Sequence, residues 1–259
     1  MLDNIDFVLL SLAALLAGFV DAVAGGGGLI QVPALFTALP AQTPATLFGT
    51  NKLASIFGTA SAALRYARQV EICWRIAIPA SLAAIVFSFA GAAAVAWLPR
   101  ETVRPLVFGL LLLVIIYTLA RPRLGQSRGA EMSPQRERHG ALALGAVLGF
   151  YDGFFGPGMG SFLIFLLVRF FAMDFLRASA VAKVINLATN AAALAYFIPH
   201  GQVLWALGLV MAVANITGAQ IGSHLAIRHG SGFVRWIFLT SAVFLLAKFG
   251  WDIFAPSFT

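Results

Sequence analysis

Two lysines and two aspartates lie inside apolar stretches of the sequence, where ionisable side chains are costly. Asp21 precedes four glycines in "DAVAGGGGLIQVP", and Asp152 precedes the glycines of "GFFGPGMG". Lys52 and Lys183 each lie well inside a later apolar segment. A charged side chain at the centre of a bilayer costs about 2.5–3.5 kcal/mol on insertion scales, so charges found there indicate a substrate or ion pathway.

The glycines that follow both aspartates predict a binding site for an anion. A helix that begins directly after such glycines exposes unpaired backbone N–H groups and the positive end of its dipole. Glycine also lets a ligand approach the backbone closely. The candidate residues are Gly25, Gly26, Gly27 and Gly28 in the first half of the chain and Gly156, Gly158 and Gly160 in the second. The alternative is that these glycines only allow close helix packing, as small residues do in membranes.

Polar side chains extend each lysine into a stripe along one face of its predicted helix. Residues at i, i+4, i+7 and i+11 share a helix face, and lysine and amide donors on one face suit an oxyanion. The candidates are Lys52, Ser55 and Thr59 with the neighbouring Asn51 in the first half, and Ser179, Lys183, Asn186 and Asn190 in the second.

An alternative role for the lysines is to neutralise Asp21 and Asp152 in buried ion pairs. Such pairs can coexist with anion binding at the same place. A carboxylate in such a pair could also titrate and couple transport to protons.

The composition places these residues in a membrane protein. Hydrophobic residues make up 60% of the 259 residues and charged residues only 10%, against roughly 25% charged in soluble domains. Apolar runs long enough to cross the ~30 Å hydrocarbon core recur along the chain. We therefore expect an all-α polytopic membrane protein. The net charge of +7 is attributed to cytoplasmic loops rather than to a nucleic-acid partner.

Residues that enzymes and metal sites need are scarce. Cys73 is the single cysteine, which excludes an intramolecular disulfide and a cysteine metal cluster. The four histidines are scattered along the chain, and no HExxH motif is present. We expect no catalytic residue, no metal and no cofactor, and therefore a transporter rather than an enzyme.

An internal repeat divides the chain into two halves. "GFVDAVAGGG" at Gly18–Gly27 resembles "GFYDGFFGPG" at Gly149–Gly158, at an offset of 131 residues. The same offset relates the two lysines to each other. We predict a first membrane repeat at 1–120, a linker at 121–140 and a second membrane repeat at 141–259.

Each repeat divides into five apolar segments, and an odd number of crossings should invert the second repeat in the bilayer. In the first repeat the segments run over 6–24, 28–38, 45–66, 72–97 and 101–120. Segment 28–38 and its counterpart 160–170 are about half as long as the core is thick. Short broken helices should therefore lie near mid-membrane. Whether they cross or are re-entrant is left open, and re-entrant segments would leave four crossings in each repeat.

The charges of the loops predict the orientation of the chain. The predicted cytoplasmic loops, which hold 12 of the 17 basic residues, are 65–75, 121–140, 169–177 and 228–235. The predicted outer loops 38–44 and 199–202 hold no lysine or arginine, whereas the predicted outer loop 99–104 holds two arginines. Aligned loops of the two repeats have opposite charge bias, as the positive-inside rule requires of inverted repeats. We expect the N-terminus outside and the linker 121–140 in the cytoplasm.

The stretches "GFVDAVAGGGGLIQVPAL" and "PATLFGTNKLASIFGTA" resemble the sulfite exporter TauE/SafE family of bacterial membrane permeases. The resemblance spans both halves of the chain. It implies a multi-pass protein of the bacterial inner membrane that transports sulfur-containing anions such as sulfite, sulfonates or sulfoacetate. The second half departs from the pattern with "GPGMG" and "AVAK", so the two half-sites are unequal.

The residues and the resemblance together predict an exporter of small sulfur-containing anions. It would work by alternating access at a central anion site between the repeats, with proton coupling left open. The alternatives are a transporter of other small anions such as carboxylates, and a cation transporter in which the aspartates bind the ion. The expected partners are a small anionic substrate and the lipid bilayer, and a homodimer is left open.

Overall fold

The computed structural model describes residues 4–97 and 133–254, and the regular elements among these residues are all α-helices, which confirms the predicted class. In chain order the helices are α1 (Asn4–Ala24), α2 (Gly28–Ala38), α3 (Pro44–Gln69), α4 (Trp74–Ala96), α6 (Pro134–Phe154), α7 (Met159–Phe170), α8 (Phe175–Phe197) and α9 (Trp205–Phe254). The predicted segment 101–120 and most of the predicted linker lie outside the described residues. The last residues of the predicted linker, 134–140, belong to α6.

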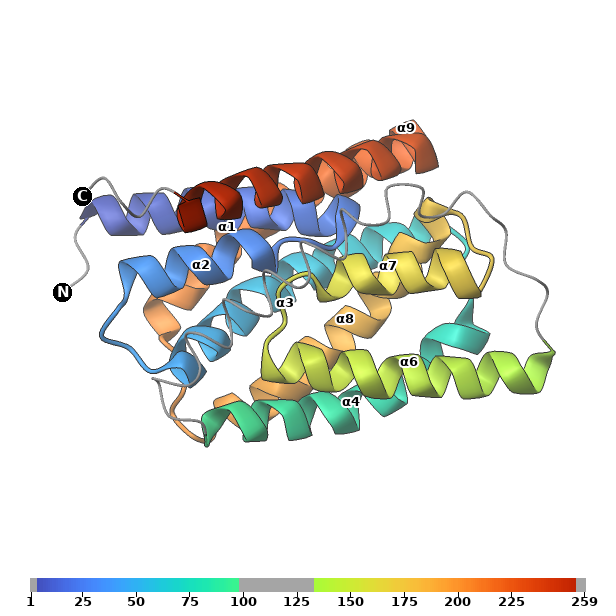
Figure 1. Ribbon diagram of the computed structural model, residues 1–259, viewed down its shortest axis with the longest axis horizontal. Coiled ribbons are helices and arrows are strands. Elements are labelled where there is room, and N and C mark those ends of the chain that lie inside the picture. Colours follow the sequence, from blue (N-terminus) through green and yellow to red (C-terminus); the bar gives the residue numbers. More distant parts are fainter. Residues whose placement is uncertain (1–3, 98–132, 255–259) are drawn as a thin grey trace.

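The helices repeat along the chain with the offset found in the sequence. The first residues of α2, α3 and α4 lie 131 residues before those of α7, α8 and α9, which are Gly28 and Met159, Pro44 and Phe175, and Trp74 and Trp205. The helix contacts repeat as well. The contact between α1 and α9 corresponds to that between α6 and α4, and the contact between α3 and α9 corresponds to that between α8 and α4. Figure 1 shows α1 and α6 running in opposite directions along the long axis. Corresponding helices of the two halves thus exchange partners, and an inverted relation between the halves stays a prediction.

Within residues 4–97 and 133–254, four helical segments are long and apolar enough to cross a membrane. They are Asp6–Ala24, Trp74–Ala96, Phe175–Phe197 and Trp205–Ile237. α2 and α7 have only 11 and 12 residues, which rise about 16–18 Å and span about half of the hydrocarbon core. α3 has 26 residues and is long enough to cross, although its polar stripe lowers its hydropathy.

Side-chain caps determine where the two lysine-bearing helices begin. Thr43 Oγ1 accepts a hydrogen bond from Thr46 N (3.2 Å) at the start of α3, where Pro44 occupies the first turn. At the matching position of the second half, Asp174 Oδ1 accepts from Leu176 N (2.9 Å) and from the amide of the next residue. Caps of this kind satisfy N–H groups that a helix leaves unpaired. They fix the register in which each lysine is presented.

The helix α9 is interrupted at Gly230, where φ is 72° and ψ is −167°. A positive φ in this range is one that glycine adopts without strain. The interruption divides α9 into two helices. The second repeat therefore contains five helical segments, as the sequence predicts.

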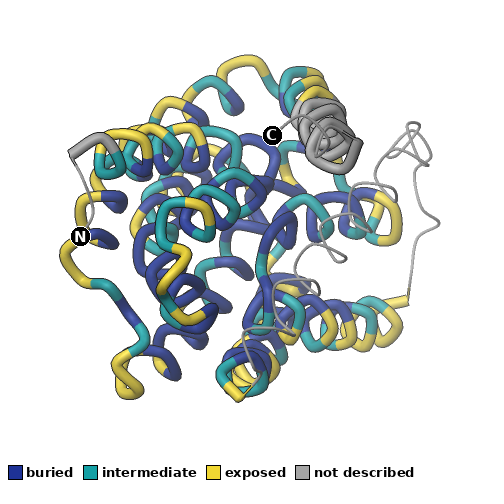
Figure 2. The backbone as a smooth tube through the Cα atoms, turned by 60° about the vertical axis from the view of Figure 1, so that its left-hand side comes forward, coloured by how far each residue is buried: buried dark blue, intermediate teal, exposed yellow. Residues whose placement is uncertain are grey.

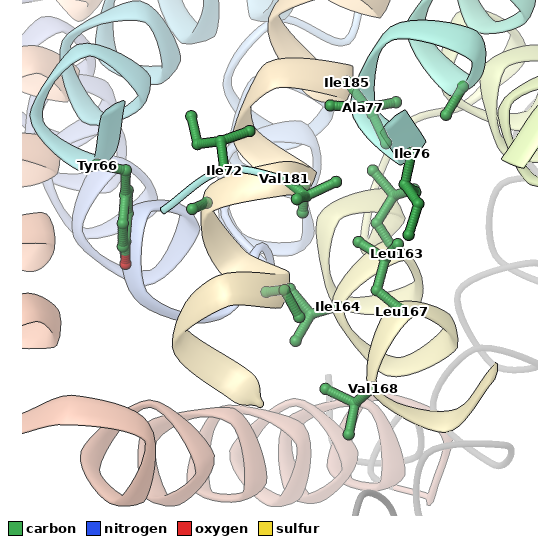
Figure 3. Packing of buried hydrophobic residues seen from close by; sticks show 14 of the residues in the cluster. Tyr66, Ile72, Ile76, Ala77, Leu163, Ile164, Leu167, Val168, Val181 and Ile185 are labelled. Carbon is green, nitrogen blue, oxygen red and sulfur yellow. The ribbon is translucent and has the colours of Figure 1, made fainter. Parts of the chain in front are cut away.

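α8 lies in the interior of the molecule. In its most apolar stretch, 72% of the residues are buried. Figure 3 shows Ile76 of α4, Leu163 and Leu167 of α7, and Val181 and Ile185 of α8 packed into one apolar cluster. In Figure 2 the outer helices alternate between buried and exposed residues. The exposed apolar side chains of these helices suit contact with lipid.

Candidate functional site

The two lysines and two aspartates form two buried ion pairs, each of which joins the two halves of the chain. Lys52 Nζ on α3 lies 2.7 Å from Asp152 Oδ2 on α6. Lys183 Nζ on α8 lies 2.7 Å from Asp21 Oδ2 on α1. Ion pairing, the alternative considered for the lysines, is therefore present. Because each lysine pairs with the aspartate of the other half, neither half holds a complete pair by itself.

A small cavity lies beside these pairs, where the N-terminal ends of α2 and α7 meet α3 and α8. Its volume is about 30 Å³, far below the ~300–1,000 Å³ of drug-sized ligand sites, so it has room for a group of only a few atoms. The lining residues are Asp21, Gly25, Gly28, Asn51, Lys52, Ser55, Thr59, Asp152, Gly156, Gly160, Asn186 and Asn190. The structure thus brings most of the candidate residues of both halves to one place.

Five of the candidates do not line the cavity, namely Gly26, Gly27, Gly158, Ser179 and Lys183. Lys183 is fully buried and its side chain is directed to Asp21 instead. Gly27 packs on α1, because a Cβ placed on it would come within 2.7 Å of Asp21 Cβ. Gly158 precedes α7 in the left-handed conformation, with φ of 80°.

The two glycine segments cross each other in direct backbone contact. Ser161 N donates to Gly25 O (3.1 Å), and Ser161 Oγ donates to Ala24 O (2.7 Å). A Cβ on Gly25 would lie 2.6 Å from Gly160 Cα, so both positions need glycine for packing as well as for access to the cavity. Tyr151 on α6 holds the second glycine segment in place, because its Oη donates a hydrogen bond to Pro157 O (2.6 Å).

Gly25 offers a test of this crossing with a neighbouring control. Gly25→Ala should lower the melting temperature, because alanine at φ of +74° costs about 1–2 kcal/mol and its methyl group would force the two segments apart. Gly26→Ala should leave it nearly unchanged, because the nearest atom to an added Cβ is Val20 Cγ1 at 3.4 Å. Thermal unfolding of both purified variants in detergent checks this, and equal melting temperatures would contradict the described crossing.

The two ion pairs differ in their surroundings. Asp21 Oδ2 accepts a hydrogen bond of regular geometry from Lys183 and keeps 17% of its side chain exposed. The side chain of Asp152 is 3% exposed, and its Oδ2 accepts no regular hydrogen bond from the described residues although Lys52 Nζ lies at contact distance. Asn51 Oδ1, which belongs to another lining residue, is a second buried acceptor without a partner among them.

Backbone N–H groups of two lining residues are unpaired. Gly28 is the first residue of α2 and Gly160 is the second residue of α7. Neither N–H donates a hydrogen bond to any part of the chain that the structure describes. Helix N-termini with free N–H groups attract negative charge, so the cavity combines these donors with the Lys52 ammonium group.

A buried amide network supports the first-half side of the cavity. Gln31 Nε2 on α2 donates weakly to Asn51 O (3.5 Å), and Asn215 Nδ2 on α9 lies 3.1 Å from both Gln31 Oε1 and Ala14 O. Gln31 was not among the candidates, although a glutamine in a short apolar helix was a usable signal. Asn215 binds neighbouring helices and does not line the cavity.

On the second-half side of the cavity, two asparagines of the polar stripe on α8 are hydrogen-bonded to each other. Asn190 Nδ2 donates to Asn186 Oδ1 (3.0 Å) along the cavity-facing side of α8. Ser179, the first member of that stripe, donates to Phe175 O (2.8 Å) and does not reach the cavity. Within the described residues no group of three or more histidine, cysteine, aspartate or glutamate side chains could hold a metal ion.

Comparison with known proteins places the chain in a family of membrane transporters. The family model described as Sulfite exporter TauE/SafE matches residues 10–249. The chain is 35% identical over 242 residues to the probable membrane transporter protein YfcA of Escherichia coli K12, with 92% of this chain and 87% of that protein covered. It is 34% identical over 241 residues to the probable membrane transporter protein ORF9 of Sinorhizobium, with 92% and 90% covered.

A third relative, a probable membrane transporter protein of Haemophilus influenzae, is 34% identical over 250 residues, with 91% of each chain covered. No solved structure matches the chain. The family match covers nearly the whole chain and confirms the resemblance seen in the sequence. The chain therefore belongs to the sulfite exporter TauE/SafE family of membrane transporters.

Proposed function

We propose that this transporter carries small sulfur-containing anions, such as sulfite or sulfonates, through the cavity between its two halves. The observation that carries the proposal is the position of Lys52, a buried cation that lines a small cavity together with the unpaired N–H groups of Gly28 and Gly160. Cations and helix N-termini converging on one point favour an oxyanion. The sulfur chemistry of the substrate rests on the family.

A cation as the substrate fits the cavity less well. Both aspartates already lie at contact distance from a lysine ammonium group. A metal or organic cation would have to displace that ammonium group and then remain beside it, where like charges repel. Small carboxylates stay the second candidate, because they offer Lys52 the same charge as a sulfonate group.

We also propose that the two halves alternate access to the cavity from the two sides of the bilayer. The cavity lies where short helices from both halves meet, which is the arrangement of many transporters with inverted repeats. Rocking of one half against the other would open and close both ion pairs, because each pair joins the halves. Export is the direction that the family name implies.

The orientation in the membrane can be tested by chemical labelling. With an outside N-terminus and a cytoplasmic linker, single cysteines placed at 121–132 of a Cys73→Ser variant should react only with a reagent on the cytoplasmic side. Intact cells and inverted membrane vesicles give the two sides. Labelling of the linker from outside the cell would reject the proposed orientation.

Binding of an anion panel to the purified protein tests the proposed function. Sulfite, methanesulfonate, thiosulfate and acetate should be compared by isothermal titration calorimetry, with sodium chloride as the reference salt. At least one sulfur oxyanion should bind more tightly than acetate and chloride. Tighter binding of acetate would assign the site to carboxylates, and binding of none of the four anions would overturn anion transport.

A further inference from the structure

The pair formed by Lys52 and Asp152 is the one that an incoming anion can open. Lys52 lines the cavity, whereas Lys183 is fully buried outside the lining and forms a regular hydrogen bond to Asp21. The contact between Lys52 and Asp152 lacks that regular geometry. An anion that enters the cavity therefore competes with Asp152 for the Lys52 ammonium group.

Charge balance then decides what happens to Asp152. In the empty cavity the two lysines offset the two aspartates. An anion bound at Lys52 would leave the nearly fully buried Asp152 as an unpaired carboxylate, which is strongly unfavourable in a buried site. One proton taken up by Asp152 restores neutrality and makes its carboxyl group a hydrogen-bond donor.

The lining of the same cavity holds a buried acceptor without a partner among the described residues. This acceptor is Asn51 Oδ1. The vacant acceptor is a second observation, independent of the ion pair, that points to a hydrogen-bond donor in this cavity.

The other charged groups near Asp152 do not replace it as the proton carrier. On the helices that contact the cavity, the charged side chains facing it are Lys52 of α3 and Asp21 of α1, and Asp21 is held by Lys183 of α8. The single charged residues of α4 and α7, Arg75 and Arg169, lie at the helix ends away from the cavity lining.

We propose that Asp152 carries one proton with each monovalent anion, so that the transporter moves anion and proton together without net charge. This inference rests on the proposed function. The proton comes from the solution from which the anion enters, and it leaves with the anion on the other side, after which Lys52 and Asp152 pair again. The same steps run in either direction, and net export requires an anion gradient larger than the opposing proton gradient.

Proton counting during anion binding tests the inference. Titration of the purified protein with methanesulfonate, which does not titrate near neutral pH, should be repeated in buffers with different ionisation enthalpies. The dependence of the observed heat on the buffer gives the number of protons taken up, which should be about one per anion. Binding without proton uptake would overturn the inference and leave anion transport standing, whereas absence of binding by the whole anion panel would overturn both.

Proton uptake by two variants tests whether Asp152 is the group that takes up the proton. Asp152→Asn should still bind methanesulfonate through Lys52, with proton uptake falling from about one to about zero. Lys183→Gln/Asp21→Asn, which removes the other pair without leaving a buried charge unpaired, should still take up about one proton per anion. Uptake that persists in Asp152→Asn would overturn the assignment. If that variant does not fold, the count in the unaltered protein and in Lys183→Gln/Asp21→Asn still decides.

Vesicles containing the protein give an independent readout of charge. Methanesulfonate movement should acidify the compartment that it enters, as reported by a trapped pH dye. Its rate should not change when the membrane potential is clamped with potassium and valinomycin, because the loaded site carries no net charge. A rate that follows the membrane potential would overturn electroneutral coupling.

Discussion

Lys183→Ala is expected to lower the free energy of unfolding by about 3 kcal/mol, the lower end of the range for breaking one side of a buried ion pair. Lys183 is fully buried, and its loss would leave Asp21 without the ammonium group that now lies 2.7 Å away. The loss is placed at the lower end because Asp21 keeps 17% of its side chain exposed. Urea unfolding in detergent, followed by tryptophan fluorescence, measures the change.

A neutral pair at the same positions is the matched control. In the double variant Lys183→Gln/Asp21→Asn no charge is left unpaired, so most of the lost stability should return. If the double variant were less stable than Lys183→Ala, lost packing rather than an unpaired aspartate would be the cause. The stabilising role given to this ion pair would then be wrong.

The neutral pair at the other position should remove anion binding. Lys52→Gln/Asp152→Asn leaves no buried charge unpaired, so the protein should fold, but the cavity would lose its cation. We expect the affinity for methanesulfonate to fall at least tenfold, which corresponds to about 1.4 kcal/mol. Isothermal titration calorimetry measures the affinity, and the melting temperature of the same sample shows whether the variant is folded.

The helices and their repeat could be predicted because their signals are local. The apolar segments, the proline and threonine at the start of α3, and the glycines before α2 all act within a few residues. Adding the offset between Lys52 and Lys183 to a helix boundary in the first half then predicts the corresponding boundary in the second half. α7 accordingly begins at Met159, one residue before the predicted segment 160–170.

The pairing between lysines and aspartates could not be predicted from the same pattern. Since one offset relates both residue types, pairing within a half and pairing between halves fit the sequence equally well. The choice depends on how the halves pack, where α3 and α6 bring Lys52 to Asp152 and α8 and α1 bring Lys183 to Asp21. Such contacts between distant segments leave no periodic signal.

The unequal roles of the two lysines were also hidden in the sequence. Lys183 occupies the same place in its helix as Lys52, with Asn186 and Asn190 on the same face. In the structure the two asparagines line the cavity while the lysine is directed to Asp21. A lysine side chain is long enough to reach several neighbouring groups. Its partner therefore depends on how the helices pack and not on the position of the lysine along its helix.

The most direct test of an anion site at Lys52 is the dissociation constant of methanesulfonate for the two neutral-pair variants, measured side by side. Both variants lose one lysine and one aspartate from buried pairs, so they differ in whether the lysine lines the cavity. The dissociation constant should rise at least tenfold in Lys52→Gln/Asp152→Asn and change much less in Lys183→Gln/Asp21→Asn. Unchanged affinity in the folded Lys52 variant, or a larger loss in the Lys183 variant, would contradict the site.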